Sequence, residues 1–281
     1  MRVLVTGAAG QLGADLVIHC EAAGDDVIAA DRAVLDVADR SAVHGAISML
    51  RPDVVVNTAA WTAVDACESD VDRADRVNAL GPRWLREACS DARSHFVQIS
   101  TDYVFDGTLG RPYREWDAPN PRSVYGASKL AGEREAGPDA TVVRTSWVCG
   151  ANGNNMVKTI LRLLERRTSL AFVDDQRGCP TFTADLAVMV RQLAVDRRSG
   201  MHHVTNQGDV SWYEFVREVV AAAGRDPAMV EPITTADLDP PRPAPRPANS
   251  VLDNAALRLA DIPLLRHHTE PLRDLVTELL G

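Results

Sequence analysis

The sequence predicts an α/β protein built on a doubly wound parallel sheet, and three observations support this prediction. The first half of the chain alternates short β-rich runs with longer helical patterns, which is the order of elements in such a sheet. The run VVV at residues 54–56 is uniformly apolar, as expected for a strand covered by helices on both faces. A glycine-rich turn at residues 7–13 follows the first strand and opens the first helix.

The β-rich runs of the first half predict strands, and the patterns between them predict helices. Strands are expected at residues 2–6, 27–30, 54–57, 96–99 and 141–144. Helices are expected at residues 11–23, 39–50, 73–92 and 124–135. We expect these elements to form a first domain over residues 1–148.

The second half is less regular and predicts a smaller, mixed α/β domain over residues 149–281. The spacing of Ser211 and Glu214 is that of a capping box, which predicts a helix from there to about residue 223. The proline-rich run PPRPAPRP at residues 240–247 cannot be helical and should be extended. Further helices are expected at 156–166, 183–195 and 271–280, and strands at 170–173 and 201–204. We expect a segment within 170–205 to return to the first domain.

Composition and charge exclude several classes of protein. The formal net charge of the 281 residues is -9, so the basic footprint of a nucleic-acid-binding protein is missing. No apolar run is long enough to span a bilayer, and the amino terminus has no signal-peptide layout. The five cysteines are scattered without C-x-x-C spacing, which argues against a zinc site and for reduced thiols. A cytoplasmic protein, monomeric or homodimeric, is expected.

The glycine-rich turn predicts a binding site for a dinucleotide. Gly7, Gly10 and Gly13 have the spacing G-x-x-G-x-x-G between a strand and a helix. Glycines let the backbone approach a pyrophosphate closely, and the helix amino terminus offers free N–H groups to it. Because this turn joins a parallel strand to its helix, the first domain is expected to be of the Rossmann type.

The end of the second strand bears on the choice of cofactor. Asp31 lies 18 residues after Gly13, where an acidic residue binds the hydroxyls of the adenosine ribose. Arg32 leaves the choice open, because an arginine at this corner could neutralise a 2′-phosphate. The cofactor is therefore expected to be NADPH or NADH, with Asp31 favouring NADH. Asp36 and Val37 follow in a stretch that could pass under the adenine.

A tyrosine and a lysine four residues apart predict the chemistry of the site. Tyr125 and Lys129 occupy i and i+4 of a predicted helix and so share a face. A lysine there is expected to lower the pKa of the phenol, making it a proton donor near neutral pH. Thr101 ends the fourth strand, and the carboxyl ends of parallel strands face the ligand crevice. We therefore expect Thr101, Tyr125 and Lys129 to act together.

This trio, combined with the glycine turn, resembles the extended short-chain dehydrogenase/reductase superfamily. The string STDYVFDG at residues 100–107 is more narrowly similar to the dTDP-4-dehydrorhamnose reductases. Further segments extend the resemblance over nearly the whole chain, including RTSWV at 144–148 and Arg246-Pro247. The resemblance implies reduction of the C4 ketone of a dTDP-4-keto-6-deoxy sugar, most closely dTDP-4-dehydro-L-rhamnose.

The resemblance also implies roles for single residues. Tyr125 is the proton donor, Lys129 binds the nicotinamide ribose and Thr101 hydrogen-bonds the carbonyl of the substrate. Trp61 departs from the smaller tyrosine or histidine usual at its position. Matches to cofactor-contacting positions are Gln11, Leu12, Gly13, Asp31, Asp36, Val37, Ala59, Ala60 and Trp61. Residues assigned to the substrate are Val64, Asp65, Thr101, Asp102, Trp147 and Arg246.

Several alternatives remain open from the sequence. The protein could act on another dTDP-4-ketohexose, such as a streptose-type antibiotic sugar, or it could be a sugar-nucleotide epimerase. A dehydratase is disfavoured, because Asp102 is followed by Tyr103 rather than by a glutamate. A non-enzymatic alternative is a protein similar to the regulatory subunit of methionine adenosyltransferase.

Arg246 is preferred for the substrate diphosphate over Lys158, Arg162 and Arg242. No metal is expected, although Asp15, Asp185 and Glu270 are acidic residues to consider.

Overall fold

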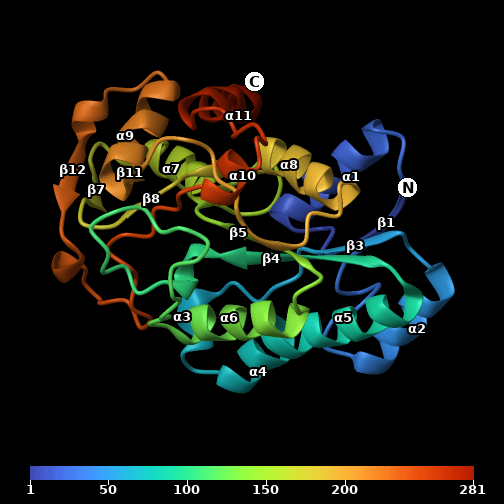
Figure 1. The fold of residues 1–281 in the computed structure, drawn as a ribbon. Coiled ribbons are helices and arrows are strands. Elements are labelled where there is room, and N and C mark those ends of the chain that lie inside the picture. Colours follow the sequence, from blue (N-terminus) through green and yellow to red (C-terminus); the bar gives the residue numbers. More distant parts are fainter.

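A six-stranded parallel sheet lies at the centre of the amino-terminal part of the protein (Figure 1). The computed structural model describes residues 1–281. The strands follow the order β10-β5-β4-β3-β1-β2. Their bounds are β1 (Arg2–Thr6), β2 (Asp26–Ala30), β3 (Val54–Asn57), β4 (His95–Thr101), β5 (Thr141–Thr145) and β10 (Gly200–His203). This arrangement confirms the doubly wound parallel sheet predicted from the sequence.

Helices cover both faces of this sheet, because its strands are apolar on both sides. Val54 and Val56 pack beneath α1 and α8, whereas Val55 packs on the opposite face with α2 and α5. Figure 1 shows α1 and α8 above the sheet and α2, α5 and α6 below it. The bounds of these helices are α1 (Gln11–Ala22), α2 (Arg40–Leu50), α5 (Gly81–Ala92), α6 (Val124–Ala136) and α8 (Thr183–Val195).

The strand order reverses direction at β1, which lies between β2 and β3. In an open α/β sheet, this switch point is where a crevice forms outside the carboxyl ends of the strands. The turn after β1 and the segment after β3 meet there. Gly7 has φ +70°, and a Cβ on it would lie 2.6 Å from the backbone nitrogen of Ala59. Only glycine allows these two segments to approach so closely.

The structure corrects the single helix expected over residues 73–92. Two short helices, α3 (Val64–Cys67) and α4 (Val71–Asp75), lead into a π-helical turn, η1 (Arg76–Leu80), before α5 begins. Pro82 has no N–H to donate to the carbonyl of Asn78, so the α-helical ladder is interrupted here. The π turn directs the side chain of Asn78 to the backbone N–H and carbonyl of Trp61, at 2.8 and 3.1 Å.

We call the six-stranded sheet with its covering helices the first layer. The carboxyl-terminal part of the chain forms a second layer, in which helices and short strands pack around an apolar core of their own. Ser211 and Glu214 form the predicted capping box at the start of α9. Residues 183–203 return to the first layer, where α8 packs against α1 and β10 pairs with β5. The helices are α7 (Met156–Leu164), α9 (Trp212–Ala222), α10 (Ala255–Leu259) and α11 (Thr269–Leu280). The paired strands are β6 (Val148–Cys149) with β9 (Thr181–Phe182), β7 (Leu170–Val173) with β12 (Val230–Ile233), and β8 (Arg177–Gly178) with β11 (Val210–Ser211).

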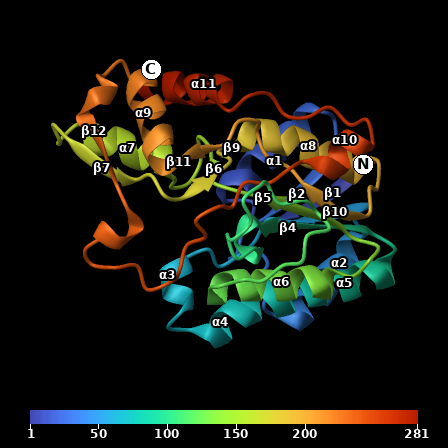
Figure 2. The same ribbon diagram turned by 60° about the vertical axis from the view of Figure 1, so that its left-hand side comes forward.

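The proline-rich segment runs from the second layer back across the first. Figure 2 shows the chain after β12 extending away from its layer toward α3. Residues 240–247 contain no helix or strand, as predicted. All five cysteines are free and buried. None of the helices has the length and apolar character needed to cross a bilayer.

Close packing of α6 on η1 generates a stability prediction. A Cβ on Gly132 would collide with the carbonyl oxygen of Asn78, whereas a Cβ on Gly45 in α2 would meet nothing. Gly132→Ala should lower the free energy of unfolding by about 1–3 kcal/mol through overpacking. Gly45→Ala is the matched control and should raise it by about 1 kcal/mol through helix propensity. Denaturant titration measures both, and equal effects of the two variants would contradict the packing argument.

Candidate active site

A cavity of about 280 Å³ opens at the switch point of the sheet. The turn after β1, the end of β2 and the segment after β3 line it together. Nine of the residues predicted to bind the cofactor belong to its lining: Gly7, Gly10, Asp31, Arg32, Asp36, Val37, Ala59, Ala60 and Trp61. Sequence analysis missed five others, which are Ala9, Leu35, Thr58, Arg73 and Val77.

The glycine turn lies at the amino terminus of α1. Gly10 is the N-cap of α1 and supplies no side-chain hydrogen bond to the helix, so the N–H groups of the first turn have no side-chain cap. A Cβ on Gly13 would collide with the carbonyl oxygen of Gly7. Leu12 points into the core, and Gln11 accepts a hydrogen bond from Asn155 at 3.1 Å. These features fit the binding of an anion at a helix amino terminus.

The end of the cavity next to β2 carries one ion pair and a turn held by hydrogen bonds. Asp31 accepts hydrogen bonds from the backbone N–H groups of Ala33 and Val34, at 2.8 and 3.0 Å. Arg32 lies 3.3 Å from the carboxylate of Asp36. The geometry therefore leaves the choice between NADH and NADPH open at this corner, as the sequence did.

Thr101 lies at the carboxyl end of β4 and is buried. Its hydroxyl accepts from the N–H of Tyr103 and donates to the carboxylate of Asp102, at 3.3 and 3.0 Å. Asp102 is also buried, and its second carboxylate oxygen, Oδ2, has no hydrogen-bond partner. Burial raises the pKa of Asp102 to about 6, although the nearby hydroxyl groups of Ser250 and Thr101 oppose the shift.

Tyr125 and Lys129 lie in α6, next to Thr101. Ser123 caps this helix by accepting from the N–H of Gly126 at 3.1 Å, which places Tyr125 in the first turn. The ring of Tyr125 packs edge-on against Tyr103, with centroids 5.5 Å apart. Lys129 is buried one turn later, and its ammonium donates to the carbonyl of Ile99 at 2.7 Å.

Burial decides the pKa values of this pair and corrects one expectation. The sequence predicted that Lys129 would lower the pKa of Tyr125. Burial instead raises the pKa of the Tyr125 phenol, and the neighbouring hydroxyl of Thr101 opposes this shift. Burial also lowers the pKa of Lys129 to about 8, and the carboxylate of Glu133 opposes that shift. The phenol therefore stays protonated at neutral pH, as a proton donor requires.

A buried ion pair behind this helix was not recognised in the sequence. Glu133 lies four residues after Lys129 and holds Arg144 of β5 through two hydrogen bonds of 2.8 and 2.7 Å. Their side chains are only 4% and 3% exposed. Ser100 of β4 donates to the same carboxylate at 2.5 Å. The pair fixes α6 against two strands of the sheet, and removing either partner would leave an uncompensated buried charge.

Two residues assigned separately to the substrate are paired with each other. Arg246 donates to both carboxylate oxygens of Asp65, at 2.7 and 2.9 Å. This hydrogen bonding holds the pKa of Asp65 below its usual range, and Arg242 lies 3.8 Å from the same carboxylate. Val64 precedes Asp65 in α3 and packs near Tyr125. The proline-rich segment is therefore fastened to α3.

Trp147 forms an aromatic stack just beyond the end of β5. Its ring lies on that of Trp212 with centroids 3.6 Å apart and planes 7° apart. The backbone of Trp147 has φ +45°, an uncommon conformation for a bulky residue. A Cβ on Gly178 would lie 2.5 Å from the Trp147 ring, so only glycine fits against the stack. Trp212 could not be identified from sequence, because 65 residues separate the two rings.

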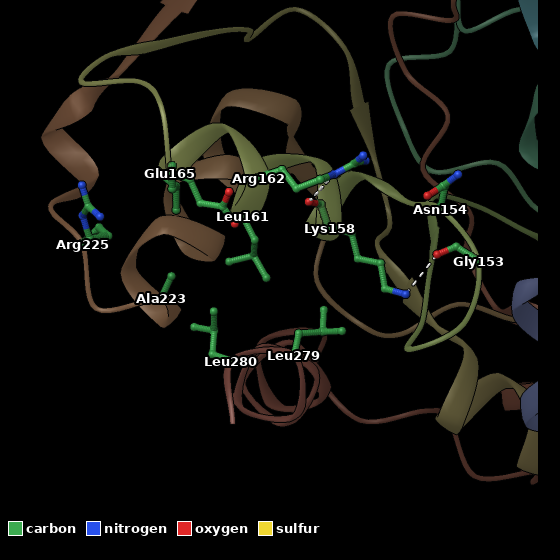
Figure 3. Close-up of a pocket in the computed structure, with 11 residues that line it drawn as sticks. Gly153, Asn154, Lys158, Leu161, Arg162, Glu165, Ala223, Arg225, Leu279 and Leu280 are labelled. Atoms are coloured by element: carbon green, nitrogen blue, oxygen red, sulfur yellow. Dashed lines mark hydrogen bonds between the residues drawn. The ribbon is translucent and has the colours of Figure 1, made fainter.

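Lys158 and Arg162 lie around a different cavity, of about 470 Å³ (Figure 3). Lys158 donates to the carbonyl of Gly153 at 3.0 Å, and Leu161, Leu279 and Leu280 form apolar walls around them. Tyr125, Thr101 and Trp147 do not belong to this lining. The structure therefore separates these two cations from the Thr101–Tyr125–Lys129 trio.

The acidic residues considered for a metal do not converge. Asp15 accepts from Asn152 at 2.9 Å and from the hydroxyl of Thr183. Asp185 pairs with Arg266 at 3.0 Å. The structure contains no group of three or more His, Cys, Asp and Glu side chains arranged to hold a metal ion.

The fold and the site together define a class of protein. A parallel sheet with a glycine-rich turn at its switch point, and a buried Tyr-x-x-x-Lys pair beside it, define an NAD(P)H-dependent oxidoreductase of the short-chain dehydrogenase/reductase type. The chain belongs to the family described as RmlD substrate binding domain, whose model matches residues 1–280. This membership confirms the resemblance drawn from the sequence motifs.

Known proteins are similar to this chain along nearly its entire length. A dTDP-4-dehydrorhamnose reductase of Streptomyces griseus is 44% identical over 100% of this chain and 94% of its own length. The crystal structure of a dTDP-4-dehydrorhamnose reductase from Clostridium acetobutylicum has a TM-score of 0.96 and 40% identity, covering 100% of both chains. A Bacillus anthracis dTDP-4-dehydrorhamnose reductase in complex with NADP has a TM-score of 0.94 and 36% identity, covering 99% of each.

Burial of Asp102 predicts a pH dependence of stability. Its pKa is raised from 3.8 to about 6 on folding, so the folded state binds the proton more tightly than the unfolded state. Stability contributed by this group is present at low pH and is lost as the pH rises from about 4 to about 6, by roughly 3 kcal/mol. Asp102→Asn removes the titration. The free energy of unfolding of the wild type, minus that of the variant, should fall over this range; a constant difference would contradict the buried charge.

Proposed function

We propose that this protein reduces the C4 ketone of a dTDP-4-keto-6-deoxy sugar with NADPH or NADH, and that the sugar is dTDP-4-dehydro-L-rhamnose. Thr101, Tyr125 and Lys129 do not line the cavity themselves, and the observation that carries the proposal is the packing that links Tyr125 to the cavity. Trp61 connects the two, since it lines the cavity and packs in the same cluster as Tyr125. The names of the relatives support the choice of substrate.

The cofactor would be held by the glycine turn and by the residues lining the cavity. When bound, its nicotinamide supplies the hydride that reduces the carbonyl carbon. Tyr125 then gives its phenolic proton to the carbonyl oxygen, which completes the hydroxyl group. The hydroxyl of Thr101 holds this oxygen, and Lys129 places a positive charge beneath the site as negative charge develops. In the structure the single hydroxyl proton of Thr101 is donated to Asp102, so this hydroxyl must turn away from Asp102 to donate to the substrate oxygen.

The proposal extends to the domains, the substrate residues and the location of the protein. Residues 1–148 would form the dinucleotide-binding domain, and residues 149–281 would mainly bind the sugar nucleotide. Arg246 and Arg242 face the single carboxylate of Asp65, so this cluster has surplus positive charge for a diphosphate. Trp147 would contact the sugar nucleotide with its stacked ring. We expect a cytoplasmic enzyme, monomeric or homodimeric.

Three alternatives differ in what they predict for turnover. A reductase of another dTDP-4-ketohexose, such as a streptose-type precursor, would share every residue discussed here. An epimerase would interconvert sugar nucleotides without net oxidation of the cofactor. A regulatory protein similar to that of methionine adenosyltransferase would bind the cofactor and turn over nothing. The complete trio favours catalysis over the regulatory role.

Product identification tests the proposed reaction. Purified protein with dTDP-4-dehydro-L-rhamnose should oxidise NADPH or NADH and yield dTDP-L-rhamnose, because the site combines a proton donor with a dinucleotide cavity. The measurement is loss of reduced nicotinamide together with mass and NMR analysis of the product. Cofactor binding without turnover of any ketosugar would support the regulatory alternative, and isomerisation without net oxidation would support the epimerase.

Removing one hydroxyl tests the proton donor. Tyr125→Phe should lower kcat by roughly 10²–10⁴, because the developing oxyanion loses its general acid. Cofactor affinity should stay close to that of the wild type. Tyr213→Phe is the matched control, since Tyr213 lies in α9 beneath Arg217 and outside the trio. Turnover by Tyr125→Phe equal to that of the control would remove Tyr125 from the mechanism.

A further inference from the structure

Arg73 in α4 lines the dinucleotide cavity, although no sequence motif identified it. Its guanidinium carbon lies 4.4 Å from the centroid of the Trp61 ring. This distance is that of a cation–π contact, in which an arginine stacks on an aromatic face. Arg73 therefore has a defined position at the cavity even though its side chain is exposed.

No carboxylate neutralises Arg73. The other arginine of the cavity, Arg32, is paired with Asp36 at 3.3 Å. The nearby Asp31 already accepts two backbone hydrogen bonds. On its own helix, Asp70 accepts the backbone N–H of Arg73 at 3.1 Å and makes no ion pair with its guanidinium. Arg73 is thus the cation of this cavity that is free to pair with an anion.

The turn that faces the cavity lacks a cation of its own. The sequence GAAGQLG at residues 7–13 contains no lysine or arginine. Its contribution to anion binding is limited to backbone N–H groups and to the dipole of α1. A dinucleotide brings at least two phosphate charges, and a guanidinium binds phosphate oxygens through paired hydrogen bonds. Arg73 in α4 can therefore supply the positive charge that the glycine turn lacks.

Trp61 and the π turn hold Arg73 in place. The side-chain amide of Asn78 binds both the N–H and the carbonyl of Trp61, at 2.8 and 3.1 Å. Asn78 belongs to η1, which continues directly from α4. The segment that carries Arg73 is therefore fastened to the residue on which its guanidinium stacks. A guanidinium held in advance loses less conformational entropy when it binds an anion.

We infer that Arg73 binds a phosphate of the dinucleotide, with the ring of Trp61 as its platform. This inference rests on the proposed function of the cavity. The shared chemistry is that of a phosphate ester, and it has two sources: the diphosphate bridge, present in NADH and NADPH, and the 2′-phosphate, present only in NADPH. Trp61 has a role in this arrangement, because its ring is the surface on which the guanidinium of Arg73 stacks.

The test measures binding without any sugar substrate. Titration calorimetry of NADPH and NADH with Arg73→Met should show about tenfold weaker binding than the wild type for at least one cofactor. Arg76→Met is the matched control, because Arg76 is exposed in the adjoining turn and does not line the cavity. Loss of affinity for both cofactors assigns Arg73 to the diphosphate, and loss for NADPH alone assigns it to the 2′-phosphate.

Two further measurements show whether a loss of affinity comes from unfolding of the variant. They also distinguish a failure of this inference from a failure of the proposed function. The unfolding temperature of Arg73→Met without cofactor should match that of Arg76→Met, and Arg73→Lys should recover part of the affinity by restoring the charge. Arg73→Met that binds both cofactors as tightly as the control would overturn the inference alone. Failure of the wild type to bind either cofactor would overturn the proposed function itself.

Discussion

The parallel direction of the six strands is the constraint on which the rest of this protein depends. Parallel strands all end at the same edge of the sheet, so segments far apart in sequence are brought together there. The turn at Gly7, the segment at Ala59 and the hydroxyl of Thr101 follow three neighbouring strands. The close approach of Gly7 to Ala59 sets how tightly this edge can close. The proposed roles of the glycine turn and of Thr101 are a consequence of that convergence.

Burial gives these side chains their chemical properties. Thr101, Tyr125 and Lys129 are all shielded from water, which keeps the phenol protonated and brings the pKa of the lysine to about 8. A buried ammonium is costly unless partners compensate. The carbonyl of Ile99 and the field of Glu133 supply part of that compensation. Because Glu133 is in turn neutralised by Arg144, the helix that carries Tyr125 and Lys129 is held to the sheet by charge as well as by packing.

Charge also joins the two layers of the molecule. Asp65 and Arg246 are 181 residues apart, yet their side chains form two hydrogen bonds. The proline-rich segment reaches α3 with little conformational freedom to lose, because proline fixes its backbone. One consequence is that the second layer is attached to the first near the predicted substrate residues. The family model matches residues 1–280, and the matching solved structure covers 100% of the chain. Both comparisons therefore include the two layers.

The sequence by itself determined the sheet, the glycine turn and the face shared by Tyr125 and Lys129, because each depends on local spacing and the periodicity of apolar residues. Tertiary structure alone decided the π turn before Pro82, the stacking of Trp147 on Trp212 and the pairing of Asp65 with Arg246. It also decided the direction of the Tyr125 pKa shift, since burial is the largest cause of that shift. The physical reason is common to all of these. Desolvation and long-range contacts depend on which residues the completed fold places side by side, and no local pattern encodes that.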